Sequence, residues 1–208
     1  MGGREIKALP TGAAAVQGGL TKETALKRAV FLDRDGVLNK GFIRNGKSYP
    51  PRCLEEFQIL EGVTEGCRRL KKAGFLLIVV TNQPDVGRGK QSVSVVKEMH
   101  QLIQQNLPID LIEVCFHETD TENFKPAPGM LFKAAARLSV DLYRSFIVGD
   151  RWRDIGCGVA AGCTTVLVEY PYAEALRNEP DFKVASLLEA ANLIIRLTEN
   201  QHELPLRN

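Results

Sequence analysis

The sequence predicts an α/β protein with a parallel sheet and helices on both of its faces. From residue 28 onward, short runs of β-branched and aliphatic residues alternate with longer stretches of helical periodicity, which is typical of βα units. The short runs are almost continuously apolar, as in parallel strands buried on both faces. The 208 residues suffice for one large domain, and no apolar stretch approaches the roughly 20 residues that cross a bilayer.

Each expected element follows from this alternation. The strands are expected at 29–33, 75–81, 111–116, 145–150 and 164–169. Helices are expected at 62–73 and 92–106, where apolar residues recur every three to four positions, at 128–138 after a proline, and before the C-capping Gly162. Two long loops, 40–57 and 117–128, interrupt this pattern. Each lies after a strand, on the edge of the sheet where open α/β proteins bind ligands.

Composition divides the chain into three parts and excludes several partners. A flexible Gly- and Ala-rich leader is expected at 1–27, the folded domain at 28–198 and a polar tail at 199–208. A net charge of +2 predicts no nucleic-acid partner, and no membrane partner is expected. The five widely spaced cysteines are typical of reduced thiols, which favours a cytoplasmic location. The oligomeric state stays open, with a monomer slightly favoured.

Two carboxylates follow the first expected strand in the segment DRDGVLN. In an extended chain, residues two apart point the same way, so Asp33 and Asp35 can face one ligand. Asp33 is predicted to attack phosphorus and form an aspartyl-phosphate, while Asp35 exchanges protons with the leaving alcohol and with water. Gly36 lets the backbone turn sharply. The alternative is a solvated Asp-x-Asp-Gly turn.

The predicted nucleophile needs a cation, and acidic residues after the fourth strand can help to hold one. Mg²⁺ prefers hard oxygen ligands. We expect Mg²⁺ to be bound by Asp33, by Asp150 and by the backbone carbonyl of Asp35, with Asp154 supporting it from the second shell or through water. The alternative for Asp154 is an acidic residue favoured by a helix N-terminus.

Other strand ends supply groups for a phosphate. Lys125 is predicted to neutralise charge at the reaction centre. The hydroxyl of Thr81, with Asn82 and Gln83 beside it, is predicted to complete the phosphate site. Considered singly, each is more often an ordinary polar loop residue.

The order of these motifs, DRDGVLN, TNQ, KPxPG and GDRWRD, resembles the haloacid dehalogenase (HAD) superfamily of phosphotransferases over residues 28–170. DRDG, VVTNQ, RGK and KPxPGM resemble the subgroup of heptose bisphosphate phosphatases and histidinol-phosphatases. The resemblance implies a Rossmann-like three-layer fold, Mg²⁺ dependence and a minimal cap. It also implies a small phosphorylated metabolite as substrate, first a heptose bisphosphate and alternatively histidinol phosphate. A catalytically silent binding or regulatory protein is the rival from another class.

The resemblance also suggests substrate contacts. Arg88 and Lys90 match the RGK segment that helps these phosphatases to hold their substrate, although a solvated basic turn is the alternative. Arg34 and Asn39 are candidates for orienting the loop or the leaving group.

The chain departs from the subgroup in the loop before Lys125. Relatives often bind structural zinc there through four Cys and His residues, but only Cys115 and His117 are present here, so no zinc is expected and the loop should be more mobile. Phe124 replaces the arginine usual before that lysine. Gly156 and Gly158 loosely mimic a dinucleotide fingerprint, but they lie within an expected helix and are interpreted as packing glycines.

Overall fold

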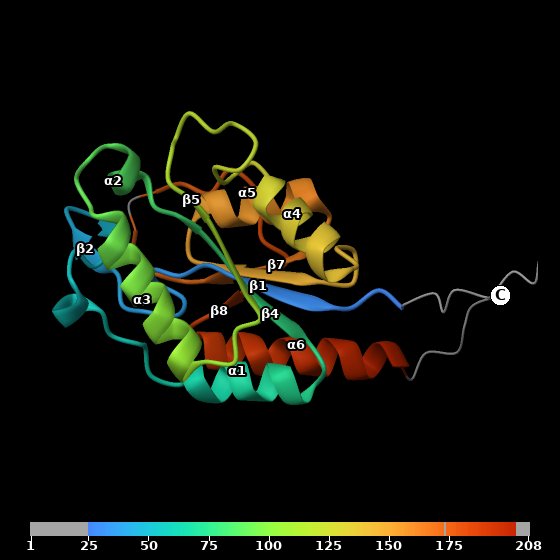
Figure 1. Cartoon of the computed structure of the whole chain (residues 1–208). Coiled ribbons are helices and arrows are strands. Elements are labelled where there is room, and N and C mark those ends of the chain that lie inside the picture. Colours follow the sequence, from blue (N-terminus) through green and yellow to red (C-terminus); the bar gives the residue numbers. More distant parts are fainter. Residues whose placement is uncertain (1–24, 173, 203–208) are drawn as a thin grey trace, which may run out of the picture.

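A computed structural model describes residues 25–172 and 174–202 and shows one six-stranded parallel sheet between two layers of helices (Figure 1). The strand order is β5-β4-β1-β6-β7-β8, and every neighbouring pair is parallel. The predicted α/β, Rossmann-like fold is therefore confirmed. None of the helices in this part of the chain combines the length and apolar character needed to cross a membrane.

The sheet strands are β1 (Ala29–Leu32), β4 (Leu76–Asn82), β5 (Leu111–Cys115), β6 (Phe146–Gly149), β7 (Thr164–Val168) and β8 (Phe182–Val184). The helices are α1 (Val63–Lys72), α2 (Pro84–Gly87), α3 (Val93–Asn106), α4 (Gly129–Leu138), α5 (Trp152–Ala161) and α6 (Leu187–His202), with a short 3-10 helix at Leu54–Glu56. A separate antiparallel hairpin pairs β2 (Phe42–Arg44) with β3 (Lys47–Tyr49).

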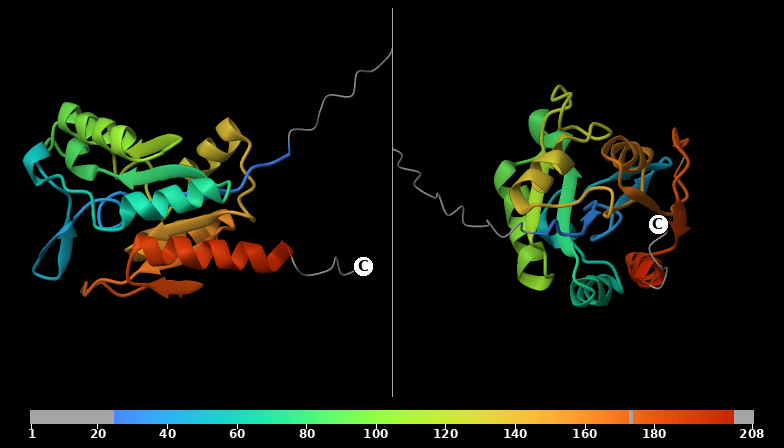
Figure 2. Two further views of the ribbon diagram at one scale, coloured as in Figure 1. Left: turned by 90° about the horizontal axis from the view of Figure 1, so that it is seen from below. Right: turned by 90° about the vertical axis from the view of Figure 1, so that its right-hand side faces the viewer.

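Both faces of the central strands are buried, which explains their continuous apolar sequences. Val30 and Leu32 of β1 pack in a core with α1 and α6, while Ala29 and Phe31 pack in a second core with α4 and α5. The two views in Figure 2 show these helices on opposite sides of the sheet. All four β1 side chains are fully buried.

The five predicted strands and the expected helices are present, but the expected loop at 40–57 is more structured than predicted. Part of it forms the β2–β3 hairpin, whose turn places Asn45 and Gly46 at positive φ angles of 51° and 71°. An Asn-Gly turn of this kind matches the twist of a hairpin. The hairpin is a short insertion after β1.

Residues on both sides of the expected domain boundaries take part in the described structure. The amide of Lys27 donates to Ser139 O at 2.8 Å, so this residue of the expected leader is attached to the domain. Residues 1–24 lie outside the described part. At the other end, α6 continues to His202 and includes the first residues of the expected tail. β8 and α6 were not predicted as elements.

Candidate active site

The order of the strands brings the predicted acids to one edge of the sheet. β1 lies between β4 and β6, so Asp33 after β1, Thr81 near the end of β4 and Asp150 after β6 leave neighbouring strands at their carboxyl ends. Asp154 reaches the same place from the first turn of α5. Segments separated by more than 100 residues therefore meet at a single site.

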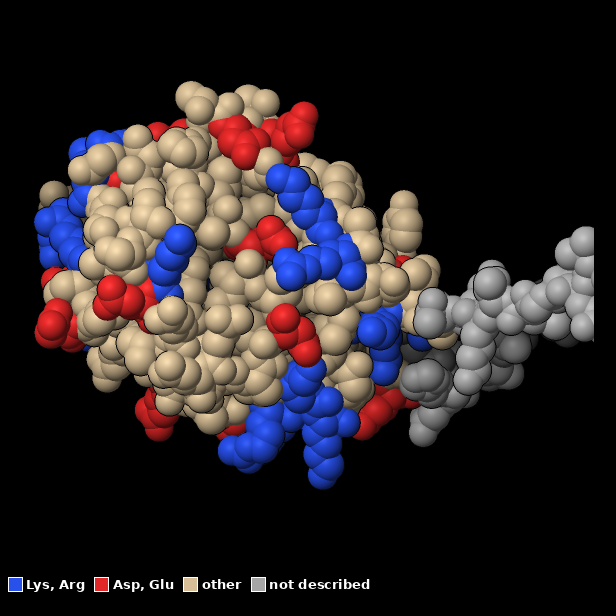
Figure 3. Space-filling model, viewed as in Figure 1, with Lys and Arg blue, Asp and Glu red and all other residues tan. Residues whose placement is uncertain are grey.

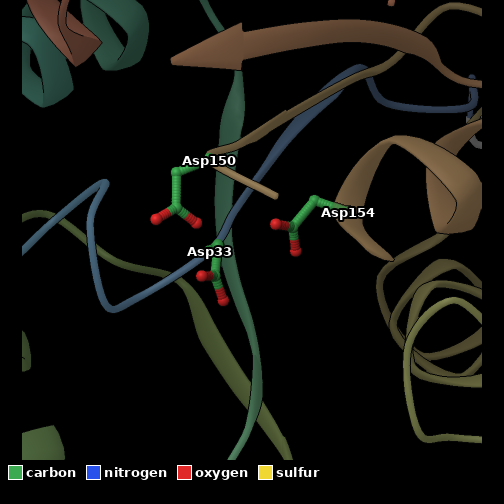
Figure 4. A group of neighbouring side chains, drawn as sticks. All are labelled: Asp33, Asp150 and Asp154. Atoms are coloured by element: carbon green, nitrogen blue, oxygen red, sulfur yellow. The ribbon is translucent and has the colours of Figure 1, made fainter. Parts of the chain in front are cut away.

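Three buried carboxylates form the centre of this site. Asp33, Asp150 and Asp154 each offer an oxygen within 4.8 Å of the others (Figure 4). The three residues are only 8%, 4% and 2% exposed, respectively. Asp150 accepts a hydrogen bond from the Tyr172 hydroxyl at 2.5 Å through Oδ2, whereas its buried Oδ1 has no partner among the described residues. Three oxygen donors, one of them unpartnered, are a donor set that suits a divalent cation such as Mg²⁺.

Lys125 supplies the positive charge within this centre. Its Nζ donates to Asp33 Oδ1 at 2.7 Å, to Asp154 Oδ1 at 2.5 Å and to the Val80 carbonyl at 2.7 Å. Burial favours the neutral amine, but the attraction of Asp154 and Asp33 outweighs it and raises the pKa of Lys125. Lys125 therefore stays charged and connects two of the three acids.

One lysine does not balance three acids. Burial raises the pKa of Asp33 to about 6; Lys125 opposes this shift, while Asp154 and Asp35 add to it by repulsion. Burial, followed by repulsion from Asp33 and Asp154, raises the pKa of Asp150 well above its usual range. The site thus carries an excess of buried negative charge, which a bound cation would offset.

The Asp35 carboxylate is fixed by three neighbours. Arg34 donates to both of its oxygens at 2.8–3.1 Å, Asn39 donates at 2.9 Å and Gln83 donates at 2.7 Å. Arg34 is fully buried, and its Nη1 lies 3.4 Å from the Nε2 of His100 on α3. The predicted proton-transfer residue is therefore held by Arg34, Asn39 and Gln83. None of these three residues lines the cavity described below.

A cavity of about 390 Å³ opens beside these groups, a volume that suits a small metabolite. Its wall includes the predicted residues Asp33, Asp35, Thr81, Asn82, Arg88 and Lys125. Asp150 lines a smaller neighbouring cavity of about 190 Å³. Lys90, one of the predicted substrate contacts, is exposed and lies outside both walls.

Asn82 and Arg88 line the cavity but already have protein partners. The side-chain amide of Asn82 accepts from Lys125 N at 3.0 Å and donates to Lys125 O at 3.1 Å, so it positions the lysine segment. Arg88 pairs with Asp85 at 3.1 Å and with Glu118 at 2.6 Å, which connects α2 to the loop after β5. Their predicted contacts with a substrate stay predictions.

The loop after β5 is organised by Asp120. Its carboxylate accepts from the backbone amides of Glu122 and Asn123 at 3.2 and 3.0 Å and from the Asn123 side chain at 2.6 Å. Cys115 Sγ donates to the His117 carbonyl at 3.4 Å. In the described ranges, Cys115 and His117 belong to no cluster of three or more metal-binding side chains.

The cavity residues that the sequence interpretation missed include Arg151, Arg153 and Glu174. The two arginines flank Trp152 in GDRWRD, where the acids alone were assigned roles. Their position beside Asp150 and Asp154 was the available signal. Glu174, which pairs with Arg151, is distant in sequence from this motif, and no sequence signal indicated its place in the site.

Comparison with known proteins agrees with this geometry. A family model described as HAD-hydrolase-like matches residues 124–190. The D-glycero-β-D-manno-heptose-1,7-bisphosphate 7-phosphatase of Pasteurella multocida is 32% identical over 187 residues, covering 81% of this chain and 97% of that protein. The Escherichia coli K12 protein of the same name is 33% identical over 185 residues, covering 80% and 93%.

Solved structures agree as well. The D,D-heptose 1,7-bisphosphate phosphatase of B. bronchiseptica, complexed with magnesium and phosphate, superimposes with a TM-score of 0.68 at 27% identity, covering 82% of this chain and 99% of that one. The chain therefore belongs to the HAD-like hydrolases, in the family of the D-glycero-D-manno-heptose 1,7-bisphosphate phosphatases.

Proposed function

We propose that this protein is a Mg²⁺-dependent phosphomonoesterase that removes the 7-phosphate of D-glycero-D-manno-heptose 1,7-bisphosphate. The observation that carries this proposal is the meeting of Asp33, Asp150, Asp154 and Lys125 in one buried cluster beside the cavity. The names of the relatives supply the substrate. The five cysteines are all unpaired, which supports the inferred cytoplasmic location.

The residues of the site suit a two-step transfer. A carboxylate oxygen of Asp33 attacks phosphorus, and the bond between phosphorus and the sugar oxygen breaks. Asp35 gives its proton to the departing sugar oxygen. Asp35 then takes a proton from water as the water attacks phosphorus and the bond between Asp33 and phosphorus breaks, which releases inorganic phosphate, restores the Asp33 carboxylate and leaves Asp35 protonated as it was at the start. Lys125 holds Asp33 in place through the second carboxylate oxygen.

Asp33 and Asp150 would hold the divalent cation, together with the backbone carbonyl of Asp35 predicted from the sequence. Asp154, whose two oxygens accept from Lys125 and from the Arg151 amide, would support it through water. When bound, the cation supplies positive charge between the attacking carboxylate and the phosphate oxygens, which repel each other. The unpartnered Asp150 Oδ1 and the excess negative charge support this assignment.

The proposal is tested by incubating the full-length chain with Mg²⁺ and the heptose 1,7-bisphosphate. We expect release of one inorganic phosphate, with ³¹P NMR showing that the 1-phosphate remains. Excess chelator should abolish the reaction and added Mg²⁺ should restore it. Histidinol phosphate and an aryl phosphate serve as parallel substrates. Preference for histidinol phosphate would overturn the substrate, and no hydrolysis of any ester would favour the silent binding protein.

Asp33→Asn is the matched variant, because it keeps the shape of the side chain and removes the nucleophile. We expect turnover to fall at least about a thousand-fold while the circular dichroism spectrum is unchanged. Substantial activity in a correctly folded Asp33→Asn protein would reject Asp33 as the nucleophile.

A further inference from the structure

Arg153 differs from the other cations of the cavity wall in its partners. Arg88 pairs with Asp85 and Glu118, Lys125 pairs with Asp33 and Asp154, and Arg151 pairs with Glu174. In residues 25–172 and 174–202, Arg153 forms no ion pair, although it lines the same cavity. Its charge is therefore available to a ligand.

Aromatic rings orient this guanidinium without using its N–H groups. The Arg153 Cζ lies 5.3 Å from the centre of the Phe124 ring and 4.9 Å from the centre of the Trp152 ring. Cation–π contacts of this kind hold the plane of an arginine, while its edge stays free to donate hydrogen bonds. The one hydrogen bond that Arg153 makes to the described protein is a long one, 3.5 Å from Nη1 to the Lys125 carbonyl.

The surroundings of Arg153 compensate its charge only in part. Partial burial, followed by repulsion from Arg151, lowers the pKa of Arg153; attraction by Glu174 and Glu118 opposes this shift without cancelling it, and the group stays positively charged at neutral pH. An anion placed beside the guanidinium would relieve both effects. A planar guanidinium matches a phosphate with two parallel hydrogen bonds.

The position of Arg153 separates it from the reaction centre. Asp33 and Lys125 are buried, whereas Arg153 is partly exposed and contacts Phe124 and the backbone of Lys125 rather than its ammonium group. When the reacting phosphate is bound at Asp33, Arg153 would thus be available to bind a second anionic group of the same substrate.

We propose that Arg153 is a specificity-determining residue that binds the phosphate of the substrate that is not hydrolysed, with Phe124 and Trp152 positioning its guanidinium. This inference rests on the proposed function, since it assigns a binding group for the 1-phosphate of a bisphosphate. Arg153 would thereby favour binding of doubly phosphorylated sugars over singly phosphorylated ones.

The test compares heptose 1,7-bisphosphate with heptose 7-phosphate as substrates for the full-length protein and for Arg153→Met, which keeps an unbranched apolar stem against the rings. We expect KM for the bisphosphate to rise about 10- to 100-fold with kcat nearly constant, and kcat/KM for the 7-phosphate to change little. Arg153→Lys should restore part of the preference. Inhibition by the product, heptose 1-phosphate, should weaken by the same factor as KM rises.

Arg177→Met is the matched control, because Arg177 also lies over Trp152, at 3.7 Å, but is absent from the cavity wall. The Arg177→Met variant should have unchanged KM and kcat values for both substrates. Equal losses on both substrates, or a fall in kcat alone, would overturn the role of Arg153 while leaving the phosphatase function intact. An inactive wild-type protein would overturn the proposed function and this inference together.

Discussion

The charge balance of the site explains the behaviour of its individual residues. Lys125 neutralises part of the charge of Asp33 and Asp154 by direct contact, whereas the side chain of Asp150 is buried beside them and, among the described residues, accepts a hydrogen bond from Tyr172 alone. Such an arrangement favours binding of a cation at the expense of stability in the cation-free protein, since an uncompensated buried charge is costly.

Asp150→Asn should therefore separate stability from activity. The amide removes one buried negative charge but can still accept from Tyr172, so we expect the metal-free protein to gain roughly 1–2 kcal/mol of unfolding free energy. Phosphatase activity should fall at least about a hundred-fold. Urea unfolding in chelator measures the first effect and phosphate release with Mg²⁺ measures the second. A destabilised metal-free variant would contradict this account of the charges.

His100 gives the protein a separate pH dependence. Burial, followed by the adjacent positive charge of Arg34, lowers the pKa of His100 to about 4 from 6.5. Between these two values the unfolded chain binds a proton that the folded chain does not, so stability falls as pH drops from about 6.5 to about 4. The loss is at most about 3 kcal/mol and does not grow at lower pH.

His100→Gln tests this dependence, because glutamine can accept a hydrogen bond from Arg34 but does not titrate. We expect the difference in unfolding free energy between the two proteins to change across pH 4–6.5, with wild type losing more on acidification. Unfolding curves that shift in parallel over this range would contradict the assignment.

The residue types of the reaction centre could be predicted from sequence, but several of their partners could not. Asp33, Asp35 and Asp150 each follow an apolar strand run, so their convergence follows from the geometry of a parallel sheet. The hydrogen bond from Gln83 to Asp35 and the contact between His100 and Arg34 depend on long-range packing, which no local sequence pattern indicates.

At the scale of elements, α5 positions the site because it packs very closely on the sheet. A Cβ added to Gly158 would lie 2.2 Å from Ile147 Cγ2 on β6 and 2.7 Å from Thr165 Cγ2 on β7. The interpretation of Gly158 as a packing glycine is thus confirmed. Asp154 at the start of this helix depends on the same approach.

Gly158→Ala should be destabilising despite its better helix propensity. The overlap costs about 1–3 kcal/mol, against a propensity gain of about 1 kcal/mol, and it pushes α5 away from the sheet. We expect a lower melting temperature and reduced kcat. Val159→Ala is the control on the same helix, because Val159 is 50% exposed. A Gly158→Ala protein as stable as wild type would show that the close packing of α5 is not required.

Elements with long apolar runs were the easiest to predict, and short or less conspicuous ones were missed. Three-residue strands such as β8 carry too few residues for a periodic signal. The missed helix α6 does carry one: Leu187, Ala190, Ala191 and Ile194 share its buried face. The Asn45-Gly46 dipeptide likewise indicates the β2–β3 hairpin within the segment expected to be a loop.

At the scale of the whole molecule, the sheet brings β5, β4, β1 and β6 side by side and so assembles acids and a lysine from three separate segments. Basic and acidic side chains are interspersed on the face shown in Figure 3. In the proposed reaction, Asp33 becomes covalently phosphorylated during turnover.

Chemical trapping tests this claim most directly. Protein turning over heptose 1,7-bisphosphate is quenched rapidly and treated with borohydride, which reduces an acyl phosphate to an alcohol, and its peptides are mapped by mass spectrometry. We expect homoserine at position 33 in the wild type and none in protein quenched without substrate. Homoserine at another acidic residue, or active turnover that leaves Asp33 unmodified under conditions that trap a known aspartyl-phosphate, would contradict it.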